Sequence, residues 1–292
     1  MKAKNSHWAK QVIALQNEDG SWGRQFHTLS VPTGKYPLTT EQALRRLMVL
    51  GFDINDVPIR KAVDYMTVCL RGERKMDDSW EKTHNWPLFT KLMLSAWIHI
   101  FEPDNELALV FAKRWANVIE KAFMNGAYNH EEYLSAYTRE FESKPKGGRE
   151  KDFACFYQVS LLTGTLSPDI ESLMLDYILS KPDGVYYMYS DPLNVLPHDF
   201  ASRKTSWYLT ALELLAGYES GKGKLRFAID WLNKNKDING QWDLGTKAND
   251  GVYFPISESW RKPDDRKQDC TERISRLLKR IDGEHLSDNQ LQ

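Results

Sequence analysis

The chain has 292 residues, enough for one large domain or two small ones, and its 39 Lys and Arg residues balance 40 Asp and Glu residues to a net charge of −1. This balance excludes the basic surface field that binding to nucleic-acid phosphates requires, so we expect no nucleic-acid partner. The 27 % of charged residues fits a globular rather than a disordered protein, whereas the 12 % of aromatic residues is high and needs a structural explanation.

Two alternating sets of helices are predicted along the chain. An amphipathic helix at 8–15 comes first, and similar helices are expected around 62–66, 112–116, 176–178 and 228–232. A more apolar set lies between them, at 41–50, 86–101, 153–163, 205–216 and 270–281. Three of these apolar segments are followed by a glycine at the position that a left-handed helix cap favours, namely Gly51, Gly164 and Gly217.

A polar turn that ends in an aromatic residue follows each amphipathic helix. Residues 16–23 and 235–242 both contain Gly-x-Trp, and weaker copies end at Trp80, Tyr128 and Tyr186. The aromatic residues recur at intervals of 48 to 58 positions, within the range of helix-pair repeats. Each repeat unit is therefore an apolar inner helix, a short loop, an amphipathic outer helix and an aromatic turn.

The two ends of this pattern predict a closed ring. The outer helix at 8–15 has no inner partner before it, and the inner helix at 270–281 has no outer partner after it. Since the apolar helices are buried only by stacking side by side, pairing these two ends would close the stack. We predict an all-α fold, an α/α toroid of five to six inner/outer helix pairs in one domain over residues 1–282, with a flexible C-terminal tail at 283–292. An open helical solenoid is the alternative.

Cysteine content and hydropathy bear on the compartment. Cys69, Cys155 and Cys270 are odd in number and far apart, which is no disulfide framework and fits a reducing compartment. The polar N-terminus lacks the apolar core of a secretory signal, and no segment reaches the roughly 18 uninterrupted apolar residues of a membrane span. We expect a cytoplasmic protein without an integral membrane segment.

The first aromatic turn resembles a known motif. Gln16, Gly20 and Trp22 form Gln-x-x-x-Gly-x-Trp, which resembles the QW repeat of squalene–hopene and oxidosqualene cyclases. The C-terminal copy ends at Trp242 but has Lys236 in place of the glutamine. With the repeat period, nearly the whole chain resembles the terpenoid cyclase/protein prenyltransferase toroid. The resemblance implies that these residues are structural, the amide holding a neighbouring helix end and the indole stacking over it.

Two departures from this family limit what the resemblance implies about activity. The chain has no Asp-x-Asp-Asp string, the acid motif of class II cyclases, and its length allows one toroid where such cyclases place their pocket between two. A stand-alone triterpene cyclase is therefore not expected. Whether the protein is an enzyme stays open, and an enzyme of this resemblance would be a transferase or an isomerase.

A metal site was weighed against a structural interpretation of the same residues. Prenyltransferase β subunits bind zinc with Asp-x-Cys and a later histidine, and Asp152, Cys155 and His198 resemble that set with a spacing one residue off. The competing interpretation is an aspartate at a helix N-terminus beside a buried free cysteine. We assign no metal and no cofactor.

Candidate site residues gather where long connections, 129–150, 187–202 and 243–268, are expected above the N-termini of the inner helices. Helix N-termini favour an anion and the inner aromatic residues an apolar tail, although these rings equally fill a core. Three acids, Asp152, Glu41 and Asp269, are the candidate catalytic residues, or else helix-capping groups. The candidate ligand-binding residues are His84, Trp86, Arg149, Tyr157, His198, Arg203 and Trp207.

Three functions remain open from the sequence. The first is a cyclase/prenyltransferase-like toroid that binds a small apolar or amphiphilic ligand, such as an isoprenoid diphosphate, in its centre, with a partner chain completing the site. The second is a carbohydrate-active α/α barrel, a glycoside hydrolase or lyase with paired acids in an aromatic groove. The third is a non-catalytic interaction scaffold whose centre is filled by side chains.

Overall fold

The computed structural model describes residues 3–27, 38–78, 85–146 and 152–283, and within these ranges all regular structure is helical. The predicted all-α class is thereby confirmed. Two short 3-10 helices, at Ala3–Asn5 and Thr246–Ala248, accompany the α-helices. The α-helices are α1 (His7–Ala14), α2 (Thr40–Val49), α3 (Val57–Leu70), α4 (Trp86–Phe101), α5 (Glu106–Phe123), α6 (His130–Phe141), α7 (Phe156–Leu161), α8 (Pro168–Ser180), α9 (Arg203–Leu215), α10 (Gly221–Lys224), α11 (Phe227–Lys234) and α12 (Pro263–Asp282).

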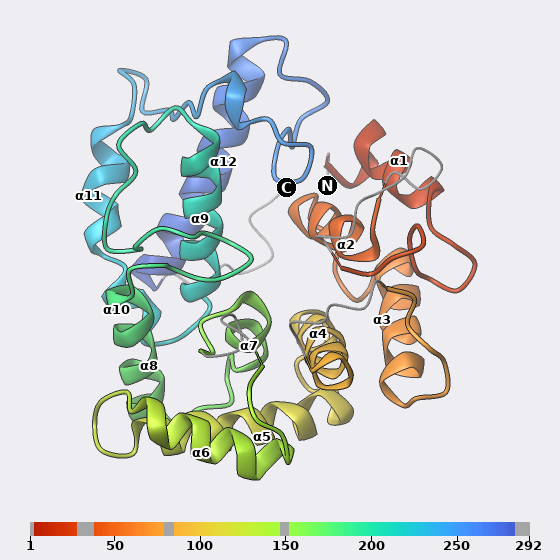
Figure 1. Ribbon diagram of the computed structural model, residues 1–292. Coiled ribbons are helices and arrows are strands. Elements are labelled where there is room, and N and C mark those ends of the chain that lie inside the picture. Colours follow the sequence, from red (N-terminus) through yellow and green to blue (C-terminus); the bar gives the residue numbers. More distant parts are fainter. Residues whose placement is uncertain (1–2, 28–37, 79–84, 147–151, 284–292) are drawn as a thin grey trace.

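The helices lie in an inner and an outer group (Figure 1). The helices α2, α4, α7, α9 and α12 surround the middle of the view, and α1, α3, α5, α8 and α11 lie further out. The predicted apolar segments supply the inner group because a helix with apolar residues around most of its circumference is stable only when buried. In α4, for example, Trp97 and Ile98 are fully buried although they point to different sides of the helix.

Two inner helices begin at other residues than predicted, and one predicted helix cap is wrong. The helix expected at 153–163 begins only at Phe156, because Ala154 O and Phe156 N bond to the backbone of Tyr186 instead of to a helical turn. The helix expected at 270–281 begins earlier, at Pro263, since proline suits a first helical turn. The left-handed cap predicted at Gly217 is wrong: Gly51 and Gly164 have φ values of 86° and 73°, but Gly217 does not have a positive φ.

Helix α6 occupies a stretch expected to be a connection. Asn129 caps it, its side chain accepting hydrogen bonds from the backbone N–H groups of Glu131 and Glu132 at 3.0 and 3.1 Å. Tyr133 and Tyr137 are buried on the face that packs against α5. An asparagine cap before aromatic residues four positions apart is a helix signal that was present in the sequence.

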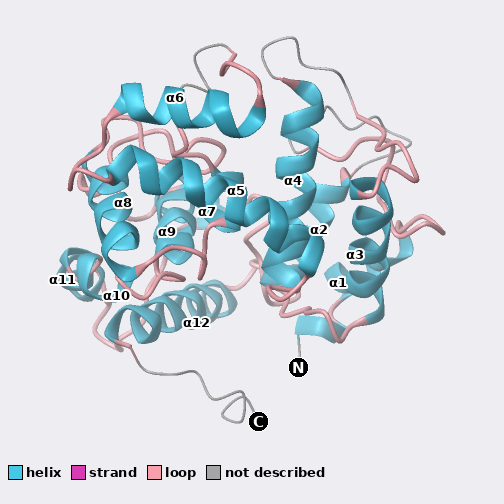
Figure 2. Ribbon diagram, turned by 90° about the horizontal axis from the view of Figure 1, so that it is seen from below, coloured by secondary structure: helices cyan, strands magenta, loops and turns pink. Residues whose placement is uncertain are grey.

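A loop, 249–262, links the two ends of the chain (Figures 1 and 2). It lies between α12 and the α1–α2 pair, and the Trp8 indole N–H donates to Ser257 O at 3.1 Å. Arg46 donates to Val252 O and Pro255 O at 3.0 and 2.5 Å, and burial lowers the pKa of Arg46 to about 10. The ends predicted to pair with each other are thus linked through this loop.

The first tryptophan turn is fastened to three helices. The indole N–H of Trp22 donates to Val12 O in α1 at 2.7 Å, and its backbone N–H donates to Thr40 Oγ1 in α2 at 3.0 Å. The Gln16 amide donates to Pro58 O, in the first turn of α3, at 2.8 Å. Trp22 is 1 % exposed, so its role is structural.

The second tryptophan turn repeats these contacts in part. The indole N–H of Trp242 donates to Leu232 O at 2.6 Å, and its backbone N–H donates to Thr271 Oγ1 in α12 at 3.1 Å. Lys236, at the position of the glutamine, places its ammonium 4.7 Å from the centre of the Trp242 ring. A cation–π contact thus stands where the first turn has an amide hydrogen bond.

Candidate functional site

Two of the predicted site residues, Glu41 and Tyr157, meet in the protein interior. Both lie in first helical turns, of α2 and α7, and both are 0 % exposed. The Tyr157 hydroxyl donates to Glu41 Oε2 at 2.9 Å, and Arg45, one turn further along α2, donates to Glu41 Oε1 at 2.7 Å. A buried carboxylate therefore has a cation on one oxygen and a phenol on the other.

Aromatic rings pack beside the tyrosine that bonds to this carboxylate and form what we call the Tyr157 cluster: Tyr157, His27, Trp86, Phe89 and Tyr187. The Phe89 ring lies 5.6 Å from Tyr157 and 5.8 Å from Trp86, both edge or tilted contacts. The Tyr187 ring lies 5.0 Å from His27 and 5.4 Å from Tyr157. Tyr187 has a φ of 66°, a conformation that costs an aromatic residue on the order of 1–3 kcal/mol and is found most often at functional sites.

Charge and burial fix the protonation states in the Tyr157 cluster. Burial and the Glu41 carboxylate raise the pKa of Tyr157 well above its usual value, so its hydroxyl stays a hydrogen-bond donor. Burial acts to lower the pKa of Arg45, but Glu41 outweighs it and the net pKa is raised. The Arg45 cation also lies over the Phe156 ring, at 4.0 Å. The Glu41–Arg45 ion pair therefore lies beside the neutral Tyr157 phenol, and the rings of the cluster have faces of partial negative charge.

Asp269, another predicted acid, holds the loop 249–262 in place. Its carboxylate, 3 % exposed, accepts hydrogen bonds from the backbone N–H groups of Ile256 and Ser257 at 2.7 and 3.0 Å and from the Trp260 indole at 2.6 Å. The Ser257 hydroxyl donates to it as well, at 3.0 Å. These bonds occupy both oxygens, which indicates an anchoring role rather than proton transfer.

Asp152, Cys155 and His198, weighed as zinc ligands, have separate partners. Asp152 forms an ion pair with Lys181 and accepts a hydrogen bond from the Tyr177 hydroxyl at 3.0 Å. Cys155 is buried, and burial raises the pKa of its thiol to about 12, whereas the His198 side chain is 99 % exposed. In the described part of the chain no three His, Cys, Asp or Glu side chains form a group that could hold a metal ion.

The other predicted ligand-binding residues do not join the Tyr157 cluster or cannot be placed. Arg203 is exposed and donates to the carbonyls of Lys247 and Asn249, both at 3.3 Å. Trp207 is 43 % exposed, where a ring lining a central cavity was expected. His84 and Arg149 lie outside the described residues.

A second buried charge cluster, around Arg273 of α12, was not predicted. Arg273 donates to Glu213 at 2.7 and 3.0 Å and to the Ser206 and Thr210 hydroxyls at 2.8 and 2.7 Å. Its guanidinium also lies 5.1 Å from the Tyr253 ring of the loop. Little in the sequence singled out Arg273, because α12 carries many other charged residues. The cluster joins α9, α12 and the loop around the middle of the molecule.

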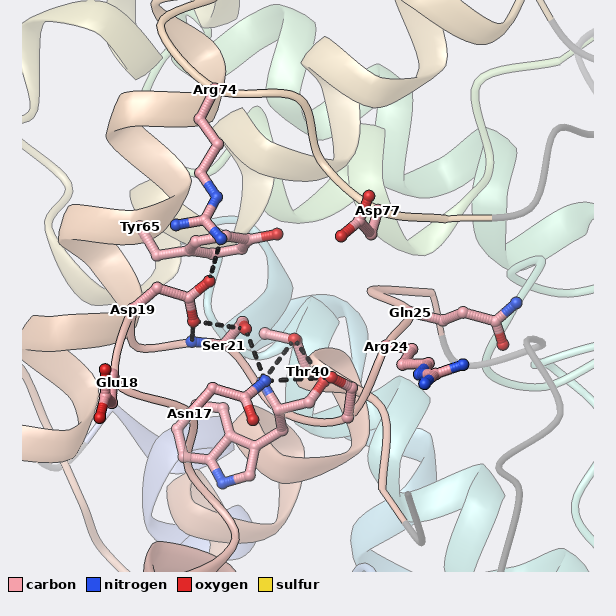
Figure 3. A pocket seen from close by; sticks show the side chains of 12 residues that line it. Asn17, Glu18, Asp19, Ser21, Arg24, Gln25, Thr40, Tyr65, Arg74 and Asp77 are labelled. Atoms are coloured by element: carbon pink, nitrogen blue, oxygen red, sulfur yellow. Dashed lines mark hydrogen bonds and ion pairs between the residues drawn. The ribbon is translucent and has the colours of Figure 1, made fainter. Parts of the chain in front are cut away.

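An open pocket of about 510 Å³ lies at the first tryptophan turn, outside the Tyr157 cluster (Figure 3). Asp19, Tyr65 and Arg74 lie on one side of it, and Arg24 and Gln25 on the other. None of these residues was predicted as a site. The only sign of this pocket in the sequence was Arg24, a charged residue directly after the polar turn at 16–23. The remaining lining residues are Asn17, Glu18, Ser21, Trp22, Gly23, Thr40 and Asp77.

Comparison with known proteins assigns no relative to this chain. No family model, no curated protein and no solved structure matches it. Of the helices in the described ranges, none combines the length and the apolar character needed to cross a bilayer. A functional assignment therefore depends on the geometry of the site.

Proposed function

We propose that the chain is an α/α toroid of the terpenoid cyclase/prenyltransferase type. The inner and outer helix groups of Figure 1 support this arrangement, with the loop 249–262 in place of a helix contact at the closure. The two tryptophan turns support it as well, because each ties the end of an outer helix to the next inner helix. The three cysteines are free and buried, which is consistent with a cytoplasmic location.

Within this fold we propose that the protein binds an apolar, isoprenoid-like ligand against the Tyr157 cluster. The observation that carries the proposal is the meeting of Glu41, Tyr157 and Phe89 at the first turns of α2, α7 and α4. Aromatic faces bind apolar chains and stabilise positive charge, and a buried carboxylate beside a phenol adds to that stabilisation. The ligand would replace contacts that the rings now make with one another. The reaction, if one takes place, is left unassigned.

The test measures ligand-dependent stability with matched variants. Farnesol and farnesyl diphosphate are added to the wild-type protein, to Phe89→Leu and to Phe111→Leu, whose ring is also buried but belongs to α5. A ligand at 100 times its Kd stabilises the folded state by about 2.7 kcal/mol, a rise of several degrees in Tm. We expect this rise in the wild type and in Phe111→Leu but not in Phe89→Leu. Mass spectrometry of lipids that co-purify with the protein identifies the native ligand.

A non-catalytic scaffold is the second candidate, and a specific observation favours it. The charged groups of the interior bond to one another: Glu41 to Arg45, and Glu213 to Arg273. A scaffold with a filled centre binds neither farnesol nor farnesyl diphosphate, and its two phenylalanine variants lose stability without any difference in ligand response. That result would exclude the isoprenoid proposal.

A further inference from the structure

The pocket at the first tryptophan turn, which we call the Arg74 pocket, is built by the turn itself. Its lining residues come from the turn 16–25, from the first residue of α2, from α3 and from the segment after α3. Its volume of about 510 Å³ lies within the roughly 300–1,000 Å³ typical of small-molecule sites. Such sites are mostly lined by apolar groups, but here charged side chains, amides and hydroxyls prevail, so a polar ligand is indicated.

Arg74 is oriented toward the pocket by two contacts. One guanidinium nitrogen, Nη2, lies 2.5 Å from Asp19 Oδ2, and the guanidinium carbon lies 5.4 Å from the centre of the Tyr65 ring. Asp19 is itself held by the Ser21 backbone N–H at 2.9 Å and the Ser21 hydroxyl at 2.6 Å. The Arg74 side chain nevertheless remains 47 % exposed. The Arg74 guanidinium, which lines the pocket, is therefore held in a fixed direction.

Carboxylate groups that accept hydrogen bonds also line the pocket that Arg74 lines. Asp77 lies at the edge of the pocket between the two sides that carry Arg74 and Arg24 (Figure 3). Among the described residues neither Asp77 nor Glu18 has a hydrogen-bond or ion-pair partner. The lining therefore carries three carboxylates and two guanidinium groups. This near balance disfavours a strongly anionic or cationic ligand, because either one would meet charges of its own sign.

We propose that the Arg74 pocket binds a neutral polyhydroxylated ligand, a sugar of one or two rings. A sugar hydroxyl both donates and accepts hydrogen bonds, so adjacent hydroxyls match a guanidinium donor beside a carboxylate acceptor. Neutral hydroxyl groups also leave the Asp19–Arg74 ion pair intact. The site is separate from the Tyr157 cluster and does not depend on the isoprenoid proposal.

The experiment is saturation-transfer NMR with a panel of neutral sugars: glucose, galactose, mannose, maltose, cellobiose and N,N′-diacetylchitobiose. The variants are Arg74→Gln, which removes the oriented donor, and Asp77→Asn, which alters an exposed carboxylate without an ion-pair partner in the described structure. Arg114→Gln is the matched control, because Arg114 is also a partly exposed, ion-paired arginine but belongs to α5. We expect at least one sugar to bind the wild type and Arg114→Gln equally, and to bind both pocket variants at least tenfold more weakly.

Three outcomes would overturn the inference. They are no binding of any sugar at 10 mM, binding that both pocket variants retain in full, and binding of glycine or glutamate in place of sugars in parallel samples. Phe89→Leu separates the two proposals. Loss of the farnesol response in that variant with unchanged sugar binding supports two independent sites, and failure of either ligand leaves the result for the other intact.

Discussion

The two tryptophan turns, 16–22 and 236–242, share a backbone and differ in their neighbours. In both, a backbone N–H donates across the turn over the same distance, Asn17 N to Ser21 O at 2.8 Å and Asp237 N to Gln241 O at 2.8 Å. In both, an indole N–H donates to the carbonyl ten residues earlier, at 2.7 and 2.6 Å. The local sequence therefore determines the turn and its tie to the preceding outer helix.

The two turns differ in what lies next to their glycines, Gly20 and Gly240. A Cβ on Gly20 would lie 2.2 Å from Lys61 O, because the backbone of α3 runs against the first turn. A Cβ on Gly240 would have no atom within 4 Å among the described residues, and the neighbouring Ile238 is fully exposed. The first turn thus packs directly against the backbone of α3, the outer helix that follows it, whereas the second turn faces solvent. The comparison separates what the motif encodes from what the neighbouring repeat adds.

The largest expected effect is the difference between Gly20→Ala and Gly240→Ala. Both glycines have a positive φ, 94° and 74°, so alanine is strained at either position by about 1 kcal/mol. Only at Gly20 does the new methyl group also collide with backbone, and we expect a loss of about 4 kcal/mol there. Urea unfolding monitored by tryptophan fluorescence measures both. Equal losses would show that α3 does not press against the first turn.

Removal of the indole donors is expected to affect the two turns alike. Trp22→Phe and Trp242→Phe each remove one of the two hydrogen bonds that the carbonyl of Val12 or Leu232 accepts; the other bond, from the backbone N–H of Leu15 or Asn235, remains. Each loss should be about 1 kcal/mol, the net contribution of one hydrogen bond, because the carbonyl keeps its backbone donor. Thermal unfolding in parallel gives the two values. A difference of more than about 1 kcal/mol would contradict the equivalence of the two turns.

The residue six positions before each tryptophan should matter more in the first turn. Gln16→Ala removes hydrogen bonds to Gly20 O and Pro58 O, at 2.9 and 2.8 Å, and is expected to cost about 1–2 kcal/mol. Lys236→Ala removes a cation–π contact with Trp242 and should cost about 0.5 kcal/mol. The denaturant concentration at the unfolding midpoint, compared between proteins with equal m-values, measures both losses of stability. Restoration of stability by Lys236→Gln would show that an amide finds a partner there too.

The last prediction concerns the stability of the folded chain at acidic pH. Asp243, directly after the second tryptophan, accepts two hydrogen bonds from Arg266 at 2.6 and 2.7 Å, and these lower the pKa of Asp243 from its usual 3.8. Because the pKa is lower in the folded chain, the stabilisation is complete above about pH 4 and is lost as pH falls through the folded pKa. Asp243→Asn should cost about 0.5–1 kcal/mol at pH 6 and less at pH 2.5, by urea titration at both pH values. A cost that stays constant with pH would exclude this ion pair as the cause.

Much of the fold could be predicted from local patterns. The apolar run at 86–101 is α4 with those bounds, and the indole of each tryptophan turn bonds to the outer helix before it. The helix predicted at 153–163 begins three residues later in the structure, because Ala154 and Phe156 bond to the backbone of Tyr186, 30 or more positions away. Local periodicity contains no information on such a partner.

The candidate site was predicted only in part, for the same physical reason. Glu41 was chosen as an acid at the start of an inner helix and Tyr157 as an aromatic residue of an inner helix, and they do meet. Yet a helix-start acid looks the same in sequence whether it binds a phenol, as Glu41 does, or four donors from a loop, as Asp269 does. The partners come from distant segments, and the sequence pattern does not name them.

The loop 249–262 has a consequence for the order in which the protein forms. The first helix, α1, donates hydrogen bonds to Ser257 and Glu258, 249 and 251 positions downstream. At a synthesis rate of about 5–20 residues per second, α1 waits about 12–50 s on the ribosome for these contacts. Meanwhile Arg46 has neither of the carbonyls that receive its hydrogen bonds. The nascent chain thus forms the contacts between its first two helices and the loop 249–262 only when translation is nearly complete.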